Sequence, residues 1–442
     1  MNRREFIRDM TAAGVAVGLT RGGRAFAGQN EAPTAGKRWP GWREGEFQFH
    51  VIYNGRAESD FCIFPDGTSL LIDSGDYKPP RREWFVSALP DRSRGPGEWV
   101  ARYVERVNPC GKDVDYFLLT HYHADHGGSS NDYTRRECRD GNDYYISGLA
   151  ETAEFIRFRK AFDRCWPTYD DPIPLDAQVN YDYVQIRRTW EWLAKHRGLQ
   201  LEKIRLGAVN QIGLAKNAAA YPEFKIRNIC SNGRIVRRDG TVRDLYAARI
   251  AAERPKKLNE NGMSVGLIFE YGPFRLYTAG DFSDSWKLPD GTWFQVEEAQ
   301  AAELDRVDVA KLNHHGCGST PKALARALSP RVWLSSAFAT HHDDDATLQR
   351  CLSESVYPGP RVFAPNVMPA ARLAEAKAKG LEWVKTLAAA TQEEMHVVVT
   401  VAPGGKDYSL AFVPAKDESM VVRDVMRFRV PERNAPEGTV ER

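Results

Sequence analysis

Short apolar stretches separated by turn residues dominate the beginning of the chain. Residues that favour β-structure are concentrated in these stretches, and Asn54-Gly55 and Pro65-Asp66-Gly67 lie between them as turn signals. The last stretch is apolar from Tyr116 to Leu119 and ends just before a group of histidines. The strands expected in this part are 46–53, 60–64, 69–72 and 113–120.

The pattern changes between about residues 128 and 222, where charged and aromatic residues accompany helix-like segments such as 150–162 and 183–196. We interpret this range as a largely helical insertion or lid. Strand patterns return after it, and Gly272-Pro273 separates two of them as a hairpin turn would. The strands expected here are 224–229, 264–271, 274–278, 307–312, 331–336, 396–401 and 408–413, and the expected helices are 321–328, 346–353 and 370–379.

This order of elements predicts the fold class. Strands come first, strands and helices are then interleaved, and two final strands follow, which fits an α/β protein with two mixed sheets packed face to face and helices outside. A chain of 442 residues is long enough to bury a large core. We expect one folded domain over residues 28–416 and a charged, peripheral C-terminal tail over residues 417–442.

The first residues have the layout of an export signal. Asn2-Arg3-Arg4-Glu5-Phe6-Ile7 contains an arginine pair, a moderately apolar stretch follows, and Ala25-Phe26-Ala27 has the small residues of a cleavage site. The arginine pair indicates the twin-arginine route, and the apolar stretch is too short for a stable membrane anchor. We therefore expect a signal peptide over residues 1–27 and a periplasmic or secreted protein without a transmembrane anchor. The alternative is an ordinary basic N-terminus.

Composition and charge narrow the function only slightly. Apolar residues make up 42% and charged residues 27% of the chain, as in soluble globular proteins. The formal net charge of +2 neither requires nor excludes a nucleic-acid partner. The 7 cysteines are scattered and contain no C-x-x-C pair, which excludes a dense disulfide framework.

The segment with the clearest chemistry follows the expected strand 113–120. His121, His123, Asp125 and His126 lie close together there. Imidazole nitrogens and carboxylate oxygens are ordinary zinc ligands, and on a tight loop alternate residues can point to one ion while their neighbours point to a second. The spacing differs from that of the helical H-E-x-x-H motif. The pattern predicts a metal site rather than a solvated group of histidines.

The segment Thr120-His121-Tyr122-His123-Ala124-Asp125-His126-Gly127-Gly128 resembles the T-H-x-H-x-D-H-x-G signature of the metallo-β-lactamase superfamily. Segments 70–75, 277–281 and 311–316 resemble further motifs of that family, in the same order. The resemblance implies a four-layer αββα fold. It also implies that Asp73 supports a ligand histidine, that Asp281 bridges two metals, and that His314 or His315 is the final ligand.

A narrower resemblance rests on 259–267, Gly280-Asp281, His314-His315-Gly316 and His341-His342. These segments are most similar to the hydrolase domain of DNA-internalisation competence proteins and to related exported phosphorylcholine esterases. The resemblance covers roughly residues 47–365 and leaves the insertion unmatched.

Two departures from the family pattern affect the expected site. Cys317 stands where the family normally has a serine after the double-histidine motif. The superfamily also supplies a further histidine between its first motif and the bridging aspartate, whereas the only histidine in that interval, His196, lies in an expected helix. Cys230, Asn228 or water could take the vacant ligand position.

The resemblance and the ligand types together imply two divalent ions. Zinc is the expected metal, and iron and manganese are alternatives because affinity alone does not select a metal. Two adjacent ions lower the pKa of a bridging water and so produce a hydroxide nucleophile. The expected ligands are His121 and His123 for one ion, Asp125, His126 and one of His314 and His315 for the second, and Asp281 for both.

Proton transfer requires groups beside these ions. Asp125 is a candidate base if only one metal binds. His342, or whichever of His314 and His315 is not a ligand, is a candidate acid for the leaving group. The alternative interpretation of His341-His342 is a solvated polar loop.

The resulting hypothesis is an exported, metal-dependent hydrolase that acts on a phosphoester or phosphodiester in a small molecule or a polymer, nucleic acid included. A lactam, lactone or thioester hydrolase of the same fold and a non-catalytic, metal-binding envelope protein are the alternatives. Trp190 and Trp192 could stack on bases, although packing within the lid is the simpler interpretation. The residues that could contact phosphate are Arg227, Arg234, Arg237, Arg238 and Arg243, which a solvated hairpin would explain equally well.

Overall fold

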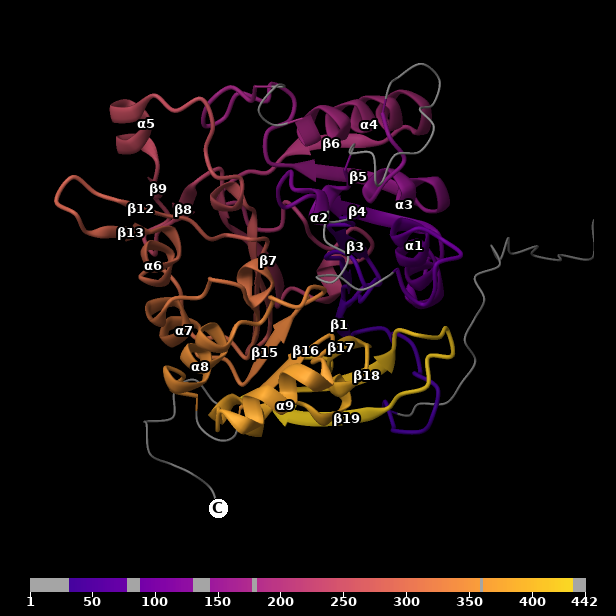
Figure 1. Cartoon of the computed structure of the whole chain (residues 1–442). Coiled ribbons are helices and arrows are strands. Elements are labelled where there is room, and N and C mark those ends of the chain that lie inside the picture. Colours follow the sequence, from indigo (N-terminus) through magenta and orange to yellow (C-terminus); the bar gives the residue numbers. More distant parts are fainter. Residues whose placement is uncertain (1–31, 78–87, 130–143, 177–180, 358–360, 432–442) are drawn as a thin grey trace, which may run out of the picture.

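The computed structural model describes residues 32–77, 88–129, 144–176, 181–357 and 361–431. Over these residues the chain is a mixed α/β protein with two large sheets (Figure 1). The expected signal peptide, residues 1–27, lies outside the described residues. None of the described helices combines the length and the apolar character that crossing a membrane requires.

The first sheet has the strand order β19-β18-β17-β1-β2-β3-β4-β5-β6. Neighbours from β19 to β3 are antiparallel, and β3, β4, β5 and β6 run parallel. Every residue of β1, β2 and β3 is buried, so both faces of the sheet are covered there. The strands are β1 Phe47–Val51, β2 Asp60–Ile63, β3 Ser69–Ile72, β4 Asp113–Leu118, β5 Arg157–Asp163, β6 Gln200–Lys203, β17 Met395–Val401, β18 Asp407–Pro414 and β19 Asp424–Arg429.

The second sheet has the order β16-β15-β14-β11-β10-β7-β8-β9. Neighbours from β16 to β11 run parallel, and the hairpin expected at Gly272-Pro273 is confirmed because Tyr271 pairs with Phe274. A separate hairpin, β12–β13, projects from the molecule at the left of Figure 1. The strands are β7 Phe224–Ser231, β8 Arg234–Val236, β9 Val242–Asp244, β10 Gly266–Tyr271, β11 Phe274–Ala279, β12 Ser285–Lys287, β13 Trp293–Gln295, β14 Val309–Lys311, β15 Val332–Ser335 and β16 Val362–Pro365.

Three apolar clusters explain how the sheets and helices pack. One contains side chains from both sheets, such as Phe49 and Phe269, whose rings are 6.2 Å apart. A second joins α1, α3 and α4 to the first sheet, and a third joins α6, α7, α8 and α9 to the second. The two helix groups lie on opposite sides of the molecule (Figure 1). The helices are α1 Pro96–Val107, α2 Ala124–Gly127, α3 Leu149–Phe155, α4 Tyr181–Arg197, α5 Ala247–Glu253, α6 Val296–Ala301, α7 Lys322–Leu328, α8 Asp345–Ser353 and α9 Ala370–Ala378.

The range 128–222 differs from the expected helical insertion. It contributes β5 and β6 to the first sheet, and the helix expected over 150–162 ends at Phe155. Residues from Arg157 onward instead pair with β4 in parallel register, so the neighbouring strand supplies the hydrogen bonds that a helix would make internally. The helix expected over 183–196 is confirmed as α4.

Residues 417–431 also differ from the peripheral tail that the sequence predicts. β19 pairs with β18 along its whole length. Met420 and Val422 are buried, and Glu418 forms ion pairs with Arg102 and Arg106 of α1. The segment therefore belongs to the folded unit; residues 432–442 lie outside the described part of the chain.

Two buried histidines, one on β1 and one on β17, should make the stability of the folded protein sensitive to acid. The Nδ1 atom of His50 lies 3.0 Å from the Tyr103 hydroxyl, and the Nδ1 atom of His396 accepts the Tyr53 N–H at 3.0 Å. Burial, and next the charge of the neighbouring His396, lower the pKa of His50 to about 3, and burial with the charge of Arg106 lowers the pKa of His396 to about 3. Both imidazoles are thus neutral in the folded protein.

We expect the free energy of unfolding to fall as the pH drops below about 6.5 towards 3. In this window the unfolded chain takes up protons that the folded chain does not, at about 1.4 kcal/mol per pH unit for each histidine. Between pH 6.5 and pH 5, the free energy of unfolding of a His50→Gln variant should therefore fall by about 2 kcal/mol less than that of the unaltered protein. Urea unfolding at the two pH values measures this difference. His196→Gln, which changes an exposed histidine, is the matched control, and an equal pH dependence of both variants would contradict the prediction.

Candidate metal centre

The candidate site lies where four strands end. Asp73 follows β3, the histidine segment follows β4, Asp281 follows β11, and His315 lies in the short helix η4 (Asn313–Gly316) after β14. β3 and β4 are parallel neighbours in the first sheet, and β11 and β14 are parallel neighbours in the second. Carboxyl ends of parallel strands share an edge of their sheet, which is the usual place of ligand sites in such sheets.

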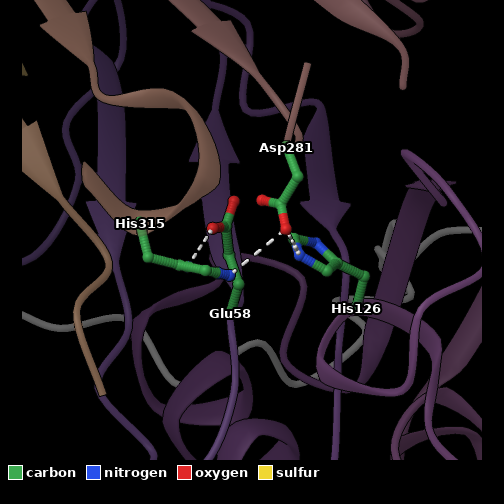
Figure 2. Close-up of side chains that lie close together, drawn as sticks. All are labelled: Glu58, His126, Asp281 and His315. Atoms are coloured by element: carbon green, nitrogen blue, oxygen red, sulfur yellow. Dashed lines mark ion pairs between the residues drawn. The ribbon is translucent and has the colours of Figure 1, made fainter. Parts of the chain in front are cut away.

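The carboxylate of Asp281 is the centre of the site. Its Oδ2 atom lies 3.2 Å from His126 Nε2, 3.6 Å from His315 Nε2 and 3.8 Å from His121 Nε2. Figure 2 shows His126 and His315 approaching this carboxylate from opposite sides, with Glu58 beside His315. All five side chains are buried. Imidazole nitrogens from both sheets thus converge on one carboxylate.

Each of these three imidazoles is held through its other ring nitrogen. His126 Nδ1 lies 2.8 Å from Asp73 Oδ2, and His315 Nδ1 lies 3.1 Å from Glu58 Oε2. The Thr120 hydroxyl donates to Asp73, so at 3.1 Å it accepts from His121 Nδ1. In the neutral form with the proton on Nδ1, each Nε2 would present a lone pair to the site, the arrangement typical of metal-ligating histidines.

His123 and Asp125 complete the cluster from its more open side. His123 Nδ1 lies 3.1 Å from His121 Nε2, and Asp125 Oδ2 lies 3.3 Å from His315 Nε2 and 3.9 Å from His126 Nε2. Both residues are half-buried, whereas His121 and His126 are buried. The ligand atoms of His121, His123 and Asp281 form one group, and those of Glu58, His126, Asp281 and His315 form another.

The charges of the site act strongly on one another. Burial alone would lower the pKa of His126, but the carboxylates of Asp281, Asp125 and Asp73 raise it well above its usual value. Burial alone would also lower the pKa of His315, but Asp281 and Asp125 raise it well above its usual value. Burial, followed by the charge of His126, lowers the pKa of His121. The carboxylates therefore favour positive charge at His126 and His315, whereas burial and the charge of His126 disfavour it at His121.

The residues present fit a divalent cation. Asp281 Oδ1 is buried without a hydrogen-bond partner among the described residues, and His126 Nε2 has only the Asp281 carboxylate beside it at 3.2 Å, which is costly unless a ligand satisfies them. Their oxygen and imidazole donors are those that zinc, iron and manganese accept. Of the Glu58 oxygens, Oε1 contacts Lys311 and Oε2 contacts Ser336 and His315. We therefore assign Glu58 to holding His315 rather than to ligation.

Unusual backbone geometry supports the two ends of the site. His314 and His315 have φ values of 48° and 50°, in the left-handed region that is unfavourable for residues with a side chain. This turn directs His315 into the cluster. At Gly75, a Cβ atom would lie 1.9 Å from the carbonyl oxygen of Asp125, so only glycine allows the loop after β3 to approach α2 this closely.

Most residues predicted from the sequence meet in this cluster, but neither Cys230 nor Asn228, the suggested replacements for the missing histidine, does so, and His196 lies elsewhere, as its expected helix implies. Cys230 lies in the apolar cluster on the helix-covered face of the second sheet, where burial raises its pKa to about 12. Asn228 donates to Arg205 and Gln211, and His196 stacks on Trp192 at 4.8 Å. The residues that converge are His121, His123, Asp125, His126, Asp281 and His315, with Asp73 behind His126.

His314 and His342 have different places from those of the ligand histidines. The ring of His314 is half-buried, with its centroid 6.3 Å from that of His315. His342 stacks on His315 at 4.6 Å, and its Nδ1 accepts the N–H groups of Phe338 and Ala339. Burial, and next the charge of His315, lower the pKa of His342 well below its usual value, which is opposite to the near-neutral pKa that the predicted acid requires.

Sequence reasoning missed Glu58 and its partner Lys311. Glu58 lies in the short connection between β1 and β2, where no local pattern marks it, and its side chain is fully buried. Lys311 ends β14 and is also fully buried. A lysine inside an otherwise apolar strand pattern is the one signal that could have suggested a buried carboxylate partner.

Three of the five arginines that could contact phosphate form ion pairs within the protein. Arg227 pairs with Glu270, Arg234 with Asp171 and Asp244, and Arg238 with Asp305. Trp190 and Trp192 are buried. These contacts favour the structural interpretation of the arginines and tryptophans.

No protein-family model matches the chain, and a search of curated proteins gave no match.

Proposed function

We propose that the protein is a metal-dependent hydrolase of the metallo-β-lactamase type, and that its substrate is a phosphoester or phosphodiester. The observation that carries this proposal is the convergence of three imidazole Nε2 atoms within 3.8 Å of Asp281 Oδ2. A surface group of histidines would have neither this burial nor a fixed Nδ1 partner for each ring.

The geometry supports a division of the ligands between two ions. His121 and His123 would hold one ion, Asp125, His126 and His315 would hold the second, and Asp281 would lie between them. Bound divalent ions would lower the pKa of water and stabilise negative charge on the substrate. The protein itself fixes the ligand rings through Asp73, Glu58 and Thr120, and the half-buried side of the cluster at His123 and Asp125 leaves room for a substrate to approach.

Two further parts of the proposal concern the fold and the location of the protein. The apolar cluster between the sheets and the helix groups outside them support a four-layer αββα arrangement. The paired arginines and the Ala25-Phe26-Ala27 sequence support twin-arginine export to the periplasm or beyond. A protein folded before export would acquire its metal in the cytoplasm; zinc is the proposed ion because its ligands are mainly imidazoles.

Metal analysis and an ester panel test the proposed function together. The protein loaded with zinc should contain close to two ions per chain and should hydrolyse bis-(p-nitrophenyl) phosphate faster than nitrocefin, a lactone or a thioester. Preference for one of the last three would replace the phosphoester by that bond and retain the metal centre. Well under one ion per chain, with no hydrolysis of any ester, would favour a non-catalytic protein. His196→Gln serves as the control variant, because this exposed side chain lies away from the cluster.

A further inference from the structure

Tyr122, the residue between two of the candidate ligands, is fixed on the side of the loop opposite to the ligand nitrogens of His121 and His123. Its neighbours His121 and His123 direct their nitrogens to the site, where Nε2 and Nδ1 are 3.1 Å apart. Tyr122 itself is 1% exposed and packs near Tyr169 and Tyr183. Any displacement of Tyr122 would therefore move both ligand histidines.

A buried ion pair holds the backbone of Tyr122. Glu260 Oε1 accepts the Tyr122 N–H at 3.0 Å. The same carboxylate receives two hydrogen bonds from Arg164, both of 2.8 Å, and the two side chains are 4% and 1% exposed. Paired, two-point contacts of this kind fix direction as well as distance. Asn232 accepts a further bond from Arg164 at 2.9 Å and so holds the guanidinium in place.

The side chain of Tyr122 is fixed by the same neighbourhood. The Arg164 guanidinium lies 4.4 Å from the centre of the Tyr122 ring, within the range of a cation–π contact. The Tyr122 hydroxyl donates to Asp163, whose carboxylate also accepts the Trp190 indole N–H at 2.9 Å and the Cys165 N–H at 2.7 Å. Backbone, ring face and hydroxyl are thus held at three separate points.

We propose that the Arg164–Glu260 pair is a positioning device for one half of the metal centre, and that it sets the affinity of the His121–His123 ion independently of the other ion. The inference rests on the proposed function. The second half has more direct supports, since Asp73 holds His126 and Glu58 holds His315, whereas Asp73 reaches His121 only through Thr120. The His121–His123 half has only two imidazoles and the shared Asp281, so its affinity depends more on their exact spacing than that of a site with more ligands.

Cobalt(II) titration of the metal-free protein tests this inference, with visible absorption and bound metal as the readouts. Glu260→Gln keeps an oxygen for the Tyr122 N–H but removes the charge that Arg164 requires. We expect one of two ions to bind about 10- to 100-fold more weakly, as for other residues that orient ligands, and the second to bind as before. Tyr122→Phe, which removes only the hydroxyl contact and is less disruptive to folding, should weaken the same ion by a smaller factor.

Asp308→Asn is the matched control. Asp308 is 2% exposed and accepts a backbone N–H, that of Arg275, at 2.8 Å, but it precedes β14 at the end opposite to His315. This variant should lose thermal stability and keep both ion affinities. Unchanged binding of both ions in Glu260→Gln, or an equal loss of both, would overturn the inference while the proposed function stands. An unaltered protein that binds no ion would overturn both.

Discussion

Replacing Asp281 by asparagine is expected to lower kcat/KM for ester hydrolysis by about 10³-fold and to abolish tight binding of at least one ion. Asp281 Oδ2 lies within 3.8 Å of three imidazole nitrogens, so its charge is shared by both halves of the site. Metal ions contribute several kcal/mol of transition-state stabilisation, and a loss of about 4 kcal/mol corresponds to about 10³-fold in rate. Steady-state kinetics and metal analysis of the purified variant measure the two effects.

Asp290→Asn is the control for this substitution. Asp290 lies in the turn of the β12–β13 hairpin, where it is exposed and accepts from Thr292. The control should retain both activity and metal. Full metal content and full activity in Asp281→Asn would remove the central element of the proposed function.

Replacing Lys311 by methionine is expected to destabilise the metal-free protein by about 3–5 kcal/mol, because breaking a buried ion pair leaves an uncompensated charge. The Lys311 ammonium contacts Glu58, and both side chains are 0% exposed. Burial opposes the charge on each partner, yet the pair raises the pKa of Lys311 and lowers that of Glu58. Asp60, also fully buried, has its pKa raised mainly by burial, so it does not offer a second stable charge for Lys311.

A double-mutant cycle separates the ion pair from simple packing. Lys311→Met combined with Glu58→Gln removes both charges, and we expect it to recover most of the stability lost in Lys311→Met alone. Guanidinium unfolding in the presence of a chelator measures all the variants without a contribution from bound metal. Additive losses in the double variant would contradict the prediction.

Local patterns in the sequence were sufficient to find the candidate ligands that lie close together along the chain. His121, His123, Asp125 and His126 are predicted by spacing because one loop presents all of them. Asp281 and His315 required the resemblance, since each follows a different strand. The choice between His314 and His315 depends on a left-handed turn that residue types alone do not reveal.

Residues that act through distant partners were beyond sequence reasoning. Glu58 and Lys311 are 253 positions apart, and Glu260 reaches Tyr122 across 138 positions. The same limit applies to strands such as β5 and β19, which are rich in charged residues and lack a regular alternation of buried and exposed positions. These segments are strands because they pair with β4 and β18. The strand propensities of single residues contain no information on such pairing.

The origin of the ligands in both sheets has a mechanical consequence. His121, His123, Asp125 and His126 extend from the first sheet, whereas Asp281 and His315 extend from the second. A bound cation would therefore cross-link the two sheets at this edge. The stability of the interface between the sheets would then increase with the concentration of free metal by mass action.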